Sequence, residues 1–337
     1  MAASVRVYRL GGAFWDVASE KSWTVSHLKD ALESMSEIPR REQRLLAGER
    51  EPADSELISN VVEETATQHL SLLVRRPDCA LWLENVQGAV FPQDVLRSAP
   101  DHVKADREVI LAVVRRHGHS LKLAPVDLRA DREVVMAAVE ENGAALAHAA
   151  EALCADRQVV LTAVATHGAA LRYAAAPLRA DRQVVRAAVA SQADALRYAA
   201  EELKSDREIV LAAVQRDGMA LEHASQELRA NREVILRSVH RHGYTLRYAS
   251  EALRRDSEVV LMAAEQDASA LKYASEELLG NLEFMCKAVQ LSDIALEFAS
   301  EGLQADLLNA VAEGADLNYA RADEVIASIA SMTACAN

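Results

Sequence analysis

An Asp or Asn residue recurs every 25 positions through most of this 337-residue chain. The series comprises Asp106, Asp131, Asp156, Asp181, Asp206, Asn231, Asp256, Asn281 and Asp306. These residue types cap helix N-termini, because their side-chain oxygens accept hydrogen bonds from free backbone N–H groups. A fixed period of this length is typical of proteins in which similar units stack side by side. The period therefore predicts about nine tandem helical repeats.

Apolar residues follow each cap at helical spacing. Val, Ile or Phe stands three residues after the cap, and Val or Ala stands eight residues after it, up to the copy that begins at Asn281. With further apolar residues at offsets four and seven, they form one stripe along a helix of about 11 residues. We expect the glycines at offset twelve to end this helix in the left-handed conformation. They are Gly118, Gly143, Gly168, Gly218 and Gly243.

A second apolar pattern follows the glycine position. Leu stands at its start (Leu121 to Leu296), Ala three residues later and Leu again four residues after that. Spacings of i, i+3 and i+7 place these residues on one face and predict a second, short helix. A helical hairpin of this size cannot bury its own apolar stripe, so neighbouring hairpins must stack on it. The sequence therefore predicts an all-α solenoid over residues 94–330.

The repeats resemble a family of tandem helical repeats that carries no assigned biochemical role. Its signature is F/Y-A-S-x-E-L followed by D-x-E-V, and the best matches here are YASEALRRDSEVV (248–260) and YASEELLGNLEF (273–284). The resemblance covers about residues 94–305. Residues 94–104 match only a second helix, with Leu96 and Val103 at the leucine positions. We interpret residues 77–93 as a linker and degenerate cap.

Residues 4–76 do not follow the 25-residue period. The stretch around Gly11-Gly12 alternates apolar and polar positions, as a β-hairpin does. SHLKDALESMSEI then has helical spacing at Leu28, Ala31, Leu32 and Met35. Leu45-Leu46 and HLSLLV (69–74) supply two further strands. The predicted fold class is therefore α+β with two domains, a small sheet domain followed by an all-α solenoid.

This small domain resembles ubiquitin. EIPRREQRLLAGEREPADSELISNV is similar to ubiquitin from the end of its helix through its third strand, and HLSLLVRR is similar to its last strand. The resemblance implies a β-grasp fold and a built-in ubiquitin-like domain, which in other proteins usually docks onto ubiquitin receptors such as the proteasome. It also implies a partner-binding patch at Leu10, Arg44, Leu46, Gly48, His69 and Ser71. Ser71 replaces an apolar residue of that patch.

Charge and composition narrow the possible partners. The net charge is −14, and nearly all of the imbalance follows residue 76. Such a surface repels phosphate backbones, so we expect no nucleic-acid partner, and a basic or neutral protein fits better. No apolar run approaches the length that crosses a bilayer, and the four separated cysteines do not form a disulfide framework or zinc module. We expect a cytoplasmic or nuclear protein that binds no membrane.

Three recurring features of the repeats could carry function. Arginine follows the cap in six copies, from Arg107 to Arg232; this row is either a basic ladder or a set of first-turn residues paired with nearby glutamates. A ring-bearing residue stands two places after the first leucine, and this row either holds an extended peptide or packs at the flank of the core. The row includes Tyr173, Tyr198, His223, Tyr248 and Tyr273. His117/His119 and His240/His242 supply too few ligands for a metal site.

No nucleophile elbow, P-loop or dinucleotide-binding fingerprint is present. We therefore expect a non-catalytic protein without a cofactor. Our first hypothesis is an adaptor that couples a client on the repeats to ubiquitin-system machinery. The alternative is a plain scaffold whose sheet domain binds something else, for example a small GTPase. A hidden hydrolase or metal enzyme is the third class.

Overall fold

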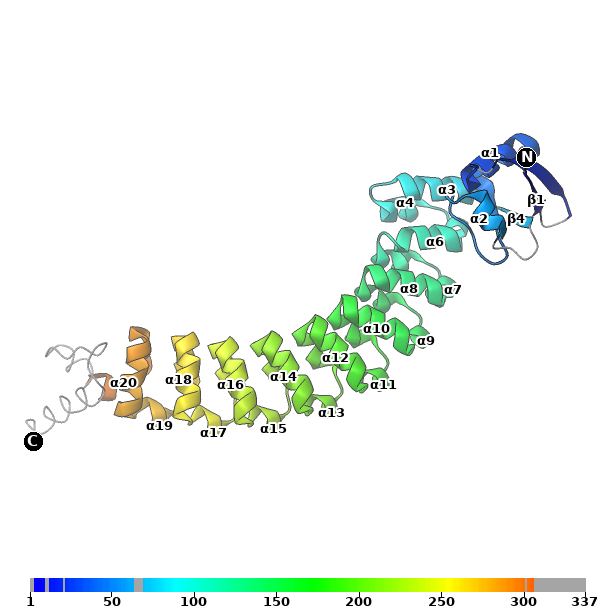
Figure 1. Cartoon of the computed structure of the whole chain (residues 1–337). Coiled ribbons are helices and arrows are strands. Elements are labelled where there is room, and N and C mark those ends of the chain that lie inside the picture. Colours follow the sequence, from blue (N-terminus) through cyan, green and yellow to red (C-terminus); the bar gives the residue numbers. More distant parts are fainter. Residues whose placement is uncertain (1–2, 10–11, 21, 64–68, 301, 306–337) are drawn as a thin grey trace, which may run out of the picture. The chain divides into compact units, whose positions relative to one another are not determined.

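A computed structural model of the chain describes residues 3–9, 12–20, 22–63, 69–300 and 302–305. Residues 1–128 and residues 129–337 form two compact units. The first holds a four-stranded sheet and the helices that follow it, and the second holds a stack of helical repeats (Figure 1). The predicted ninth cap, Asp306, lies outside the described residues. The boundaries at residues 76, 93 and 330 stay predictions.

A mixed sheet with one covering helix forms the start of the first unit. The sheet has the order β2-β1-β4-β3; β1 runs antiparallel to β2 and parallel to β4, and β3 runs antiparallel to β4. The elements are β1 (Ala3–Arg9), β2 (Phe14–Ser19), α1 (Val25–Ser36), η1 (Arg40–Glu42), β3 (Gln43–Leu46), α2 (Ile58–Glu63) and β4 (His69–Val74). Parallel neighbours need a long crossover connection, and α1 lies within it.

The core of this sheet domain lies between the sheet and α1. Val7, Leu70 and Leu72 of the sheet are fully buried, as are Leu28 and Leu32 of α1. The predicted hairpin, helix and two further strands are all present. The expectation that Met35 belongs to the apolar stripe is wrong, because its side chain is 51% exposed. The buried residues of α1 all lie in its first two turns, so its last turn extends past the core.

The remaining helices of the first unit include two short helices with the repeat spacing. They are α3 (Pro77–Gly88), α4 (Pro92–Ser98), α5 (Asp101–Lys104), α6 (Arg107–Val114), η2 (Gly118–Leu123) and α7 (Val126–Arg129), the last of which ends in the second unit. Leu96 and Val103 are fully buried at the predicted leucine positions. Much of the segment that we interpret as a linker forms α3, which buries Cys79, Ala80 and Val86.

Each repeat of the second unit begins with a capped α-helix. These helices are α8 (Arg132–Glu141), α10 (Arg157–Thr166), α12 (Arg182–Ser191), α14 (Arg207–Arg216), α16 (Arg232–Arg241), α18 (Ser257–Gln266) and α20 (Leu282–Leu291). The Asp or Asn before each helix accepts at least one hydrogen bond from a backbone N–H of the first turn. The predicted capping role is therefore confirmed for every described copy in this unit.

The second helix of each repeat is not continuous, so that prediction is wrong in detail. A six-residue 3₁₀-helix comes first, and a four-residue α-helix follows. The pairs are η3 (Gly143–His148) with α9 (Glu151–Cys154), η4 (Gly168–Tyr173) with α11 (Ala176–Arg179), η5 (Ala193–Tyr198) with α13 (Glu201–Lys204), η6 (Gly218–His223) with α15 (Gln226–Arg229), η7 (Gly243–Tyr248) with α17 (Glu251–Arg254), and η8 (Ala268–Tyr273) with α19 (Glu276–Leu279); η9 (Asp293–Phe298) closes the described stack. The residue between the two pieces is extended, as Ala199 shows with φ −66° and ψ 154°.

The break serves contacts between repeats. The N–H of the residue before each short α-helix donates to a carbonyl of the preceding repeat, for example from Ala200 to the oxygen of Arg179 at 2.9 Å. The same bond recurs from Ala150 to Arg129 and from Ser225 to Lys204. Because backbone groups make this bond, it is independent of the side chains. It joins consecutive repeats at a fixed register.

The glycines at offset twelve do not take the left-handed conformation, so that expectation is wrong. Among the described residues, the glycines with positive φ are Gly12 and Gly48. Gly143 is instead buried against the next repeat, where an added Cβ would lie 2.0 Å from the carbonyl oxygen of Ala163. The equivalent distance from Gly243 to the oxygen of Ala263 is 2.2 Å. Glycine is therefore required here by close approach of two backbones.

Candidate functional site

The open face of the sheet carries most of the predicted patch. The strand register aligns Phe14, Tyr8, Ser71 and Leu46 in one row across all four strands. Leu46 and Ser71 are half-buried, whereas Tyr8 is 36% and Phe14 54% exposed. Side chains alternate between the two faces of a strand, so this row points away from the core formed by its neighbours. The row is one partly apolar surface.

Two further predicted residues adjoin this row. His69 lies two residues before Ser71 in β4 and therefore on the same face of the sheet. Its ring meets that of Tyr8 edge-on, with the ring centroids 4.9 Å apart. Gly48 lies in the turn after β3 with φ +66°, a conformation that favours glycine. Leu10 lies outside the described residues. Sequence reasoning missed Tyr8 and Phe14, although the alternation in β1 and β2 already places them on the outward face.

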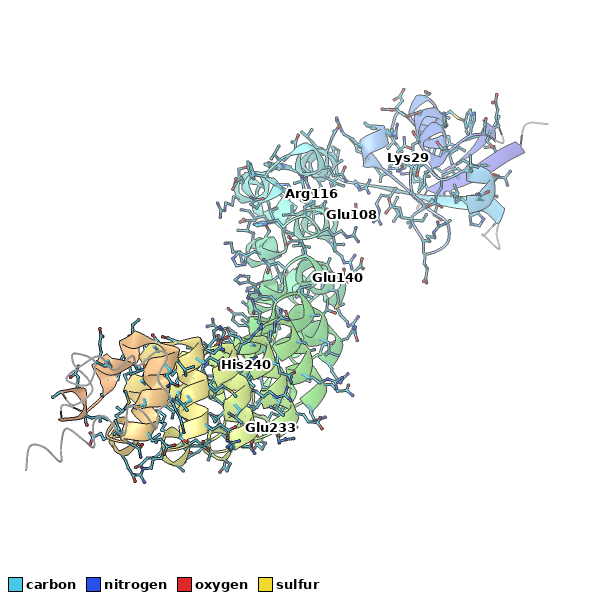
Figure 2. The ribbon with its side chains drawn as sticks, turned by 60° about the vertical axis from the view of Figure 1, so that its left-hand side comes forward. Lys29, Glu108, Arg116, Glu140, Glu233 and His240 are labelled. Carbon is cyan, nitrogen blue, oxygen red and sulfur yellow. The ribbon has the colours of Figure 1, made fainter. Side chains whose placement is uncertain are left out.

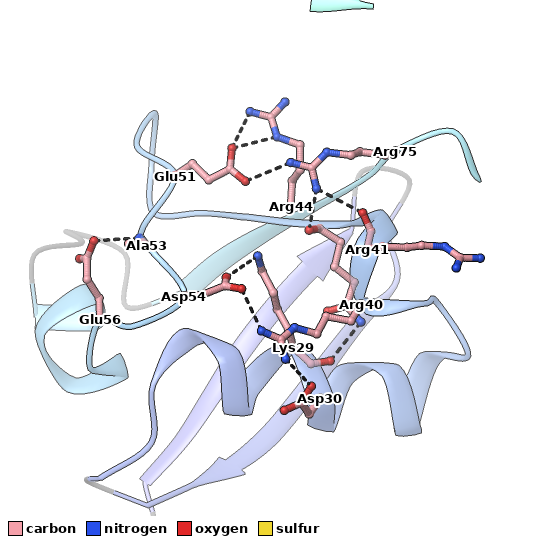
Figure 3. Close-up of polar contacts among 11 residues, drawn as sticks. Lys29, Asp30, Arg40, Arg41, Arg44, Glu51, Ala53, Asp54, Glu56 and Arg75 are labelled. Atoms are coloured by element: carbon pink, nitrogen blue, oxygen red, sulfur yellow. Dashed lines mark hydrogen bonds and ion pairs between the residues drawn. The ribbon is translucent and has the colours of Figure 1, made fainter. Parts of the chain in front are cut away.

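Arg44 is engaged within the chain. Its guanidinium pairs with Glu51 and with Glu108, at the start of α6. Arg75 at the end of β4 pairs with the same two carboxylates, so the four side chains form a closed ring of ion pairs. In Figure 3, dashed lines join Glu51 to both arginines. Glu108 is labelled in Figure 2.

This ring also affects the titration of Arg44. Burial lowers its pKa, but hydrogen bonding to Glu51 and the charge of Glu108 outweigh burial and raise the pKa above its ordinary value. None of the four side chains is more than about one-third exposed. Ion pairs within the chain therefore hold the polar border of the patch in place.

The arginines after the caps pair with carboxylates of the following repeat. The distance from Nε to the cap carboxylate is 2.9 Å for Arg132–Asp156, 3.0 Å for Arg157–Asp181, 2.7 Å for Arg182–Asp206 and 3.0 Å for Arg232–Asp256. The cap that follows Arg207 is the neutral Asn231, and Arg207 pairs with Glu233, which is labelled in Figure 2. Each of these arginines thus joins two repeats.

These ion pairs lower the pKa values of the cap carboxylates. The hydrogen bond from Arg182 is the largest cause that holds the pKa of Asp206 below its ordinary value, although burial opposes it. Arg132 and Arg157 lower the pKa of Asp156 and Asp181 in the same way. The row of arginines is therefore a ladder between repeats, and its charge is neutralised within the fold.

The predicted row of ring-bearing residues lies at the ends of the 3₁₀-helices. All five are half-buried: Tyr173, Tyr198, His223, Tyr248 and Tyr273. The exposed residue just before the ring is basic in four of these copies, and each such cation lies over aromatic rings. The pairs include Arg172 over Tyr173 (5.0 Å) and Tyr198 (5.9 Å), Arg197 over Tyr198 (5.3 Å), Arg247 over Tyr248 (4.8 Å) and Lys272 over Tyr273 (4.9 Å). The structure thus combines the predicted rings with cations that sequence reasoning did not single out.

Two members of the row also contact acidic side chains. The hydroxyl of Tyr248 donates to Glu222 at 2.8 Å, and burial together with this carboxylate raises the pKa of Tyr248. His223 lies 2.9 Å from Asp194. Both acids come from the repeat before the ring that they contact. The row is therefore continuous from one repeat to the next.

The described residues contain neither a cluster of metal ligands nor a helix that could span a membrane. No three His, Cys, Asp or Glu side chains there are grouped so that they could hold a metal ion. Burial raises the pKa of the Cys79 thiol to about 11. None of the described helices is both long and apolar enough to cross a membrane.

The repeats match one protein family. The model described as "Domain of unknown function (DUF4116)" matches seven overlapping segments: residues 106–154, 131–179, 156–204, 181–229, 206–254, 231–279 and 256–304. Together these segments cover more than half of the chain. The chain belongs to the DUF4116 family. Each match spans two 25-residue units, so a DUF4116 segment is a pair of stacked repeats. No curated protein and no solved structure matches the chain.

Proposed function

We propose that this chain is a non-catalytic adaptor with two interaction surfaces. A ubiquitin-like N-terminal domain engages ubiquitin receptors, and the DUF4116 repeats hold a protein client. The observation that carries the first half is the row across the open sheet face, where Leu46 and Ser71 lie beside Tyr8 and His69. The strand order, the single covering helix and the resemblance to ubiquitin support this proposal.

The composition of that face suggests how it would bind. Ser71 removes an apolar group from the ubiquitin-like patch, while Tyr8 and Phe14 add aromatic surface in the same row. Tyrosine supplies a large apolar body with a polar tip and is enriched at interfaces. We therefore expect a shallow apolar partner surface, with Leu46 and the aromatic pair making the central contacts.

The test is binding of the full chain to a purified ubiquitin-receptor domain. We expect Leu46→Ala to weaken this binding about tenfold, as truncation of a central contact does. Val90→Ala is the matched control, because Val90 is an aliphatic residue of the same unit with 79% exposure. Free ubiquitin should compete with the chain for the receptor. Equal affinities of the wild type and Leu46→Ala would contradict the proposal.

A second candidate function is a plain scaffold unrelated to ubiquitin receptors. Two observations favour it: the polar Ser71 at the centre of the row, and the ion pairs that hold Arg44 to Glu51 and Glu108. In this case the sheet face binds another partner, such as a small GTPase. Free ubiquitin would then leave binding of that partner unchanged.

A further inference from the structure

The cations of the second unit fall into two classes. Those after the caps are neutralised by carboxylates of the following repeat. Most of those at the 3₁₀-helices and at the ends of the short α-helices lack such partners, although Arg197 pairs with Asp194 and Lys204 pairs with Glu201. Among residues 129–300 and 302–305, Arg172, Arg247 and Lys272 have no carboxylate partner and lie only against tyrosine rings and hydroxyls. Their positive charge is therefore uncompensated.

A second set of unpaired cations ends the short α-helices. In four copies the Nε of the arginine at this position is buried without a hydrogen-bond partner: Arg129, Arg179, Arg229 and Arg254, all of them half-buried. Within the described part of the chain their guanidinium groups form no ion pair. A buried donor without a partner is costly, and a ligand that supplies an acceptor removes that cost. Four copies of the repeat share this unmet requirement.

The backbone of these cations lies next to the end of the ring-bearing 3₁₀-helix in the following repeat. Cys154 occupies the same repeat position as Arg179, and its thiol donates to the carbonyl oxygen of Leu146 at 3.7 Å. This position therefore faces the last turn of the 3₁₀-helix in its own repeat, where the ring-bearing residue stands. The carbonyl of Arg179 in turn binds the N–H of Ala200, two residues after Tyr198. We name the surface formed by these two sets of cations and the rings between them the basic–aromatic strip.

We propose that the basic–aromatic strip binds an extended acidic peptide. This inference rests on the proposed role of the repeats in holding a client, and it specifies the chemistry of that client. Helices pack about 8–10 Å apart, whereas an extended chain advances about 3.3 Å per residue. Every third residue of such a peptide thus meets a new repeat. Carboxylates at third positions would face the cations at Arg172, Arg247 and Lys272, with the intervening residues against the rings. The third position that meets Glu222 would take an uncharged residue.

The surroundings of the strip favour a peptide over a nucleic acid. Exposed carboxylates stand at the start of the short helices, including Glu201, Glu251 and Glu276. Asp194 and Glu222 reach into the row itself. A phosphate backbone carries charge too densely to avoid these acids, and the net charge of −14 repels it further. A peptide with spaced carboxylates meets the cations and can place an uncharged residue opposite Glu222.

The test uses the full chain and labelled peptides of about 15 residues, long enough to cross five repeats. One peptide has Asp at every third position except the middle one, which would meet Glu222. A second has the same composition with its Asp residues consecutive, and a third has Lys in place of Asp. We expect the periodic Asp peptide to bind at least about fivefold more tightly than the consecutive one in fluorescence anisotropy. The Lys peptide should not bind, because like charges across an interface repel.

Substitutions locate the binding surface. Arg172→Glu with Arg247→Glu should weaken binding of the periodic peptide at least about tenfold, since each reversal places like charges together. The matched control is Arg186→Glu with Arg237→Glu, two exposed arginines on the long helices α12 and α16. This control should change affinity less than about twofold, because screening at physiological salt limits the effect of distant charges.

Three results would overturn the inference. The first is absence of binding by the periodic Asp peptide, and the second is an equal loss of affinity in both double variants. The third is tighter binding of a single-stranded oligonucleotide of equal charge, which would make a nucleic acid the partner. Leu46→Ala should bind the peptide like the wild type. Failure of the strip is therefore distinguishable from failure of the sheet patch.

Discussion

The carboxylate of an Asp cap illustrates how one side chain can serve two repeats. Asp206 accepts hydrogen bonds from the N–H groups of Glu208 and Ile209, and its second oxygen accepts from Arg182 of the preceding repeat. The same carboxylate thus caps a helix and joins it to its neighbour. Sequence reasoning identified both residue types. It did not identify their pairing, because residues 24 positions apart become neighbours only when the stacking register is known.

We expect Arg182→Gln to destabilise the second unit only slightly at pH 7, since Arg182 is 48% exposed and solvent weakens its ion pairs. The pKa of Asp206 is lowered in the folded state, so its pairing stabilises the fold above the unfolded pKa of about 3.9. That contribution is lost as pH falls through the folded pKa. Urea unfolding at pH 7 and near pH 3 should show a difference between wild type and variant that shrinks at the lower pH. A difference that stays constant with pH would contradict the pairing.

The glycine at offset twelve shows a different limit of sequence reasoning. Glycine near a helix end usually indicates a left-handed residue. Here Gly143 and Gly168 each lie against the next repeat, where an added Cβ would be 2.0 and 2.4 Å, respectively, from a carbonyl oxygen. Ala193 stands at the same repeat position and is buried. A tolerance for alanine at this position is itself the signal against a positive φ, which alanine rarely adopts.

The broken second helix is the element that sequence patterns described least well. The leucine and alanine at i and i+3 share a face in both an α-helix and a 3₁₀-helix. Periodicity alone therefore does not distinguish one short α-helix from a 3₁₀-helix followed by a separate turn. The long helices were predicted more accurately, because the cap, the stripe and the helix length agree at each copy. The break is explained by the backbone bond between repeats, which needs an extended residue at this point.

Removal of that backbone bond should weaken the stack. Ala200 has φ −63° and ψ 153°, which proline adopts without strain, so Ala200→Pro removes the N–H donor to Arg179 and little else. We expect a loss of about 1–2 kcal/mol in the free energy of unfolding. Glu201→Pro is the control, because the first residue of α13 needs no N–H donor. Equal stability of the two variants in chemical denaturation would show that this bond does not join the repeats.

In both units, many charged side chains pair within the fold, and a separate surface has no partner within it. In the first unit, the ring of Arg44, Glu51, Arg75 and Glu108 borders an exposed row of the sheet. In the second unit, paired arginines join the repeats while the basic–aromatic strip stays unpaired. The sequence predicted a sheet domain, a repeat array and both rows of candidate residues. It did not predict which cations remain unpaired, because that depends on contacts between repeats.

A shared core between neighbouring repeats is the basis of this description of the second unit. Leu196 is fully buried in η5, and Leu196→Ala should cost about 2–5 kcal/mol. Hydrogen exchange of the full chain, followed by mass spectrometry, measures where that cost appears. If repeats are stable only against their neighbours, backbone amides of α10 and α14 should lose protection together with those of α12. Faster exchange confined to residues 181–205 would show that each repeat folds as an independent unit, which contradicts a stacked solenoid.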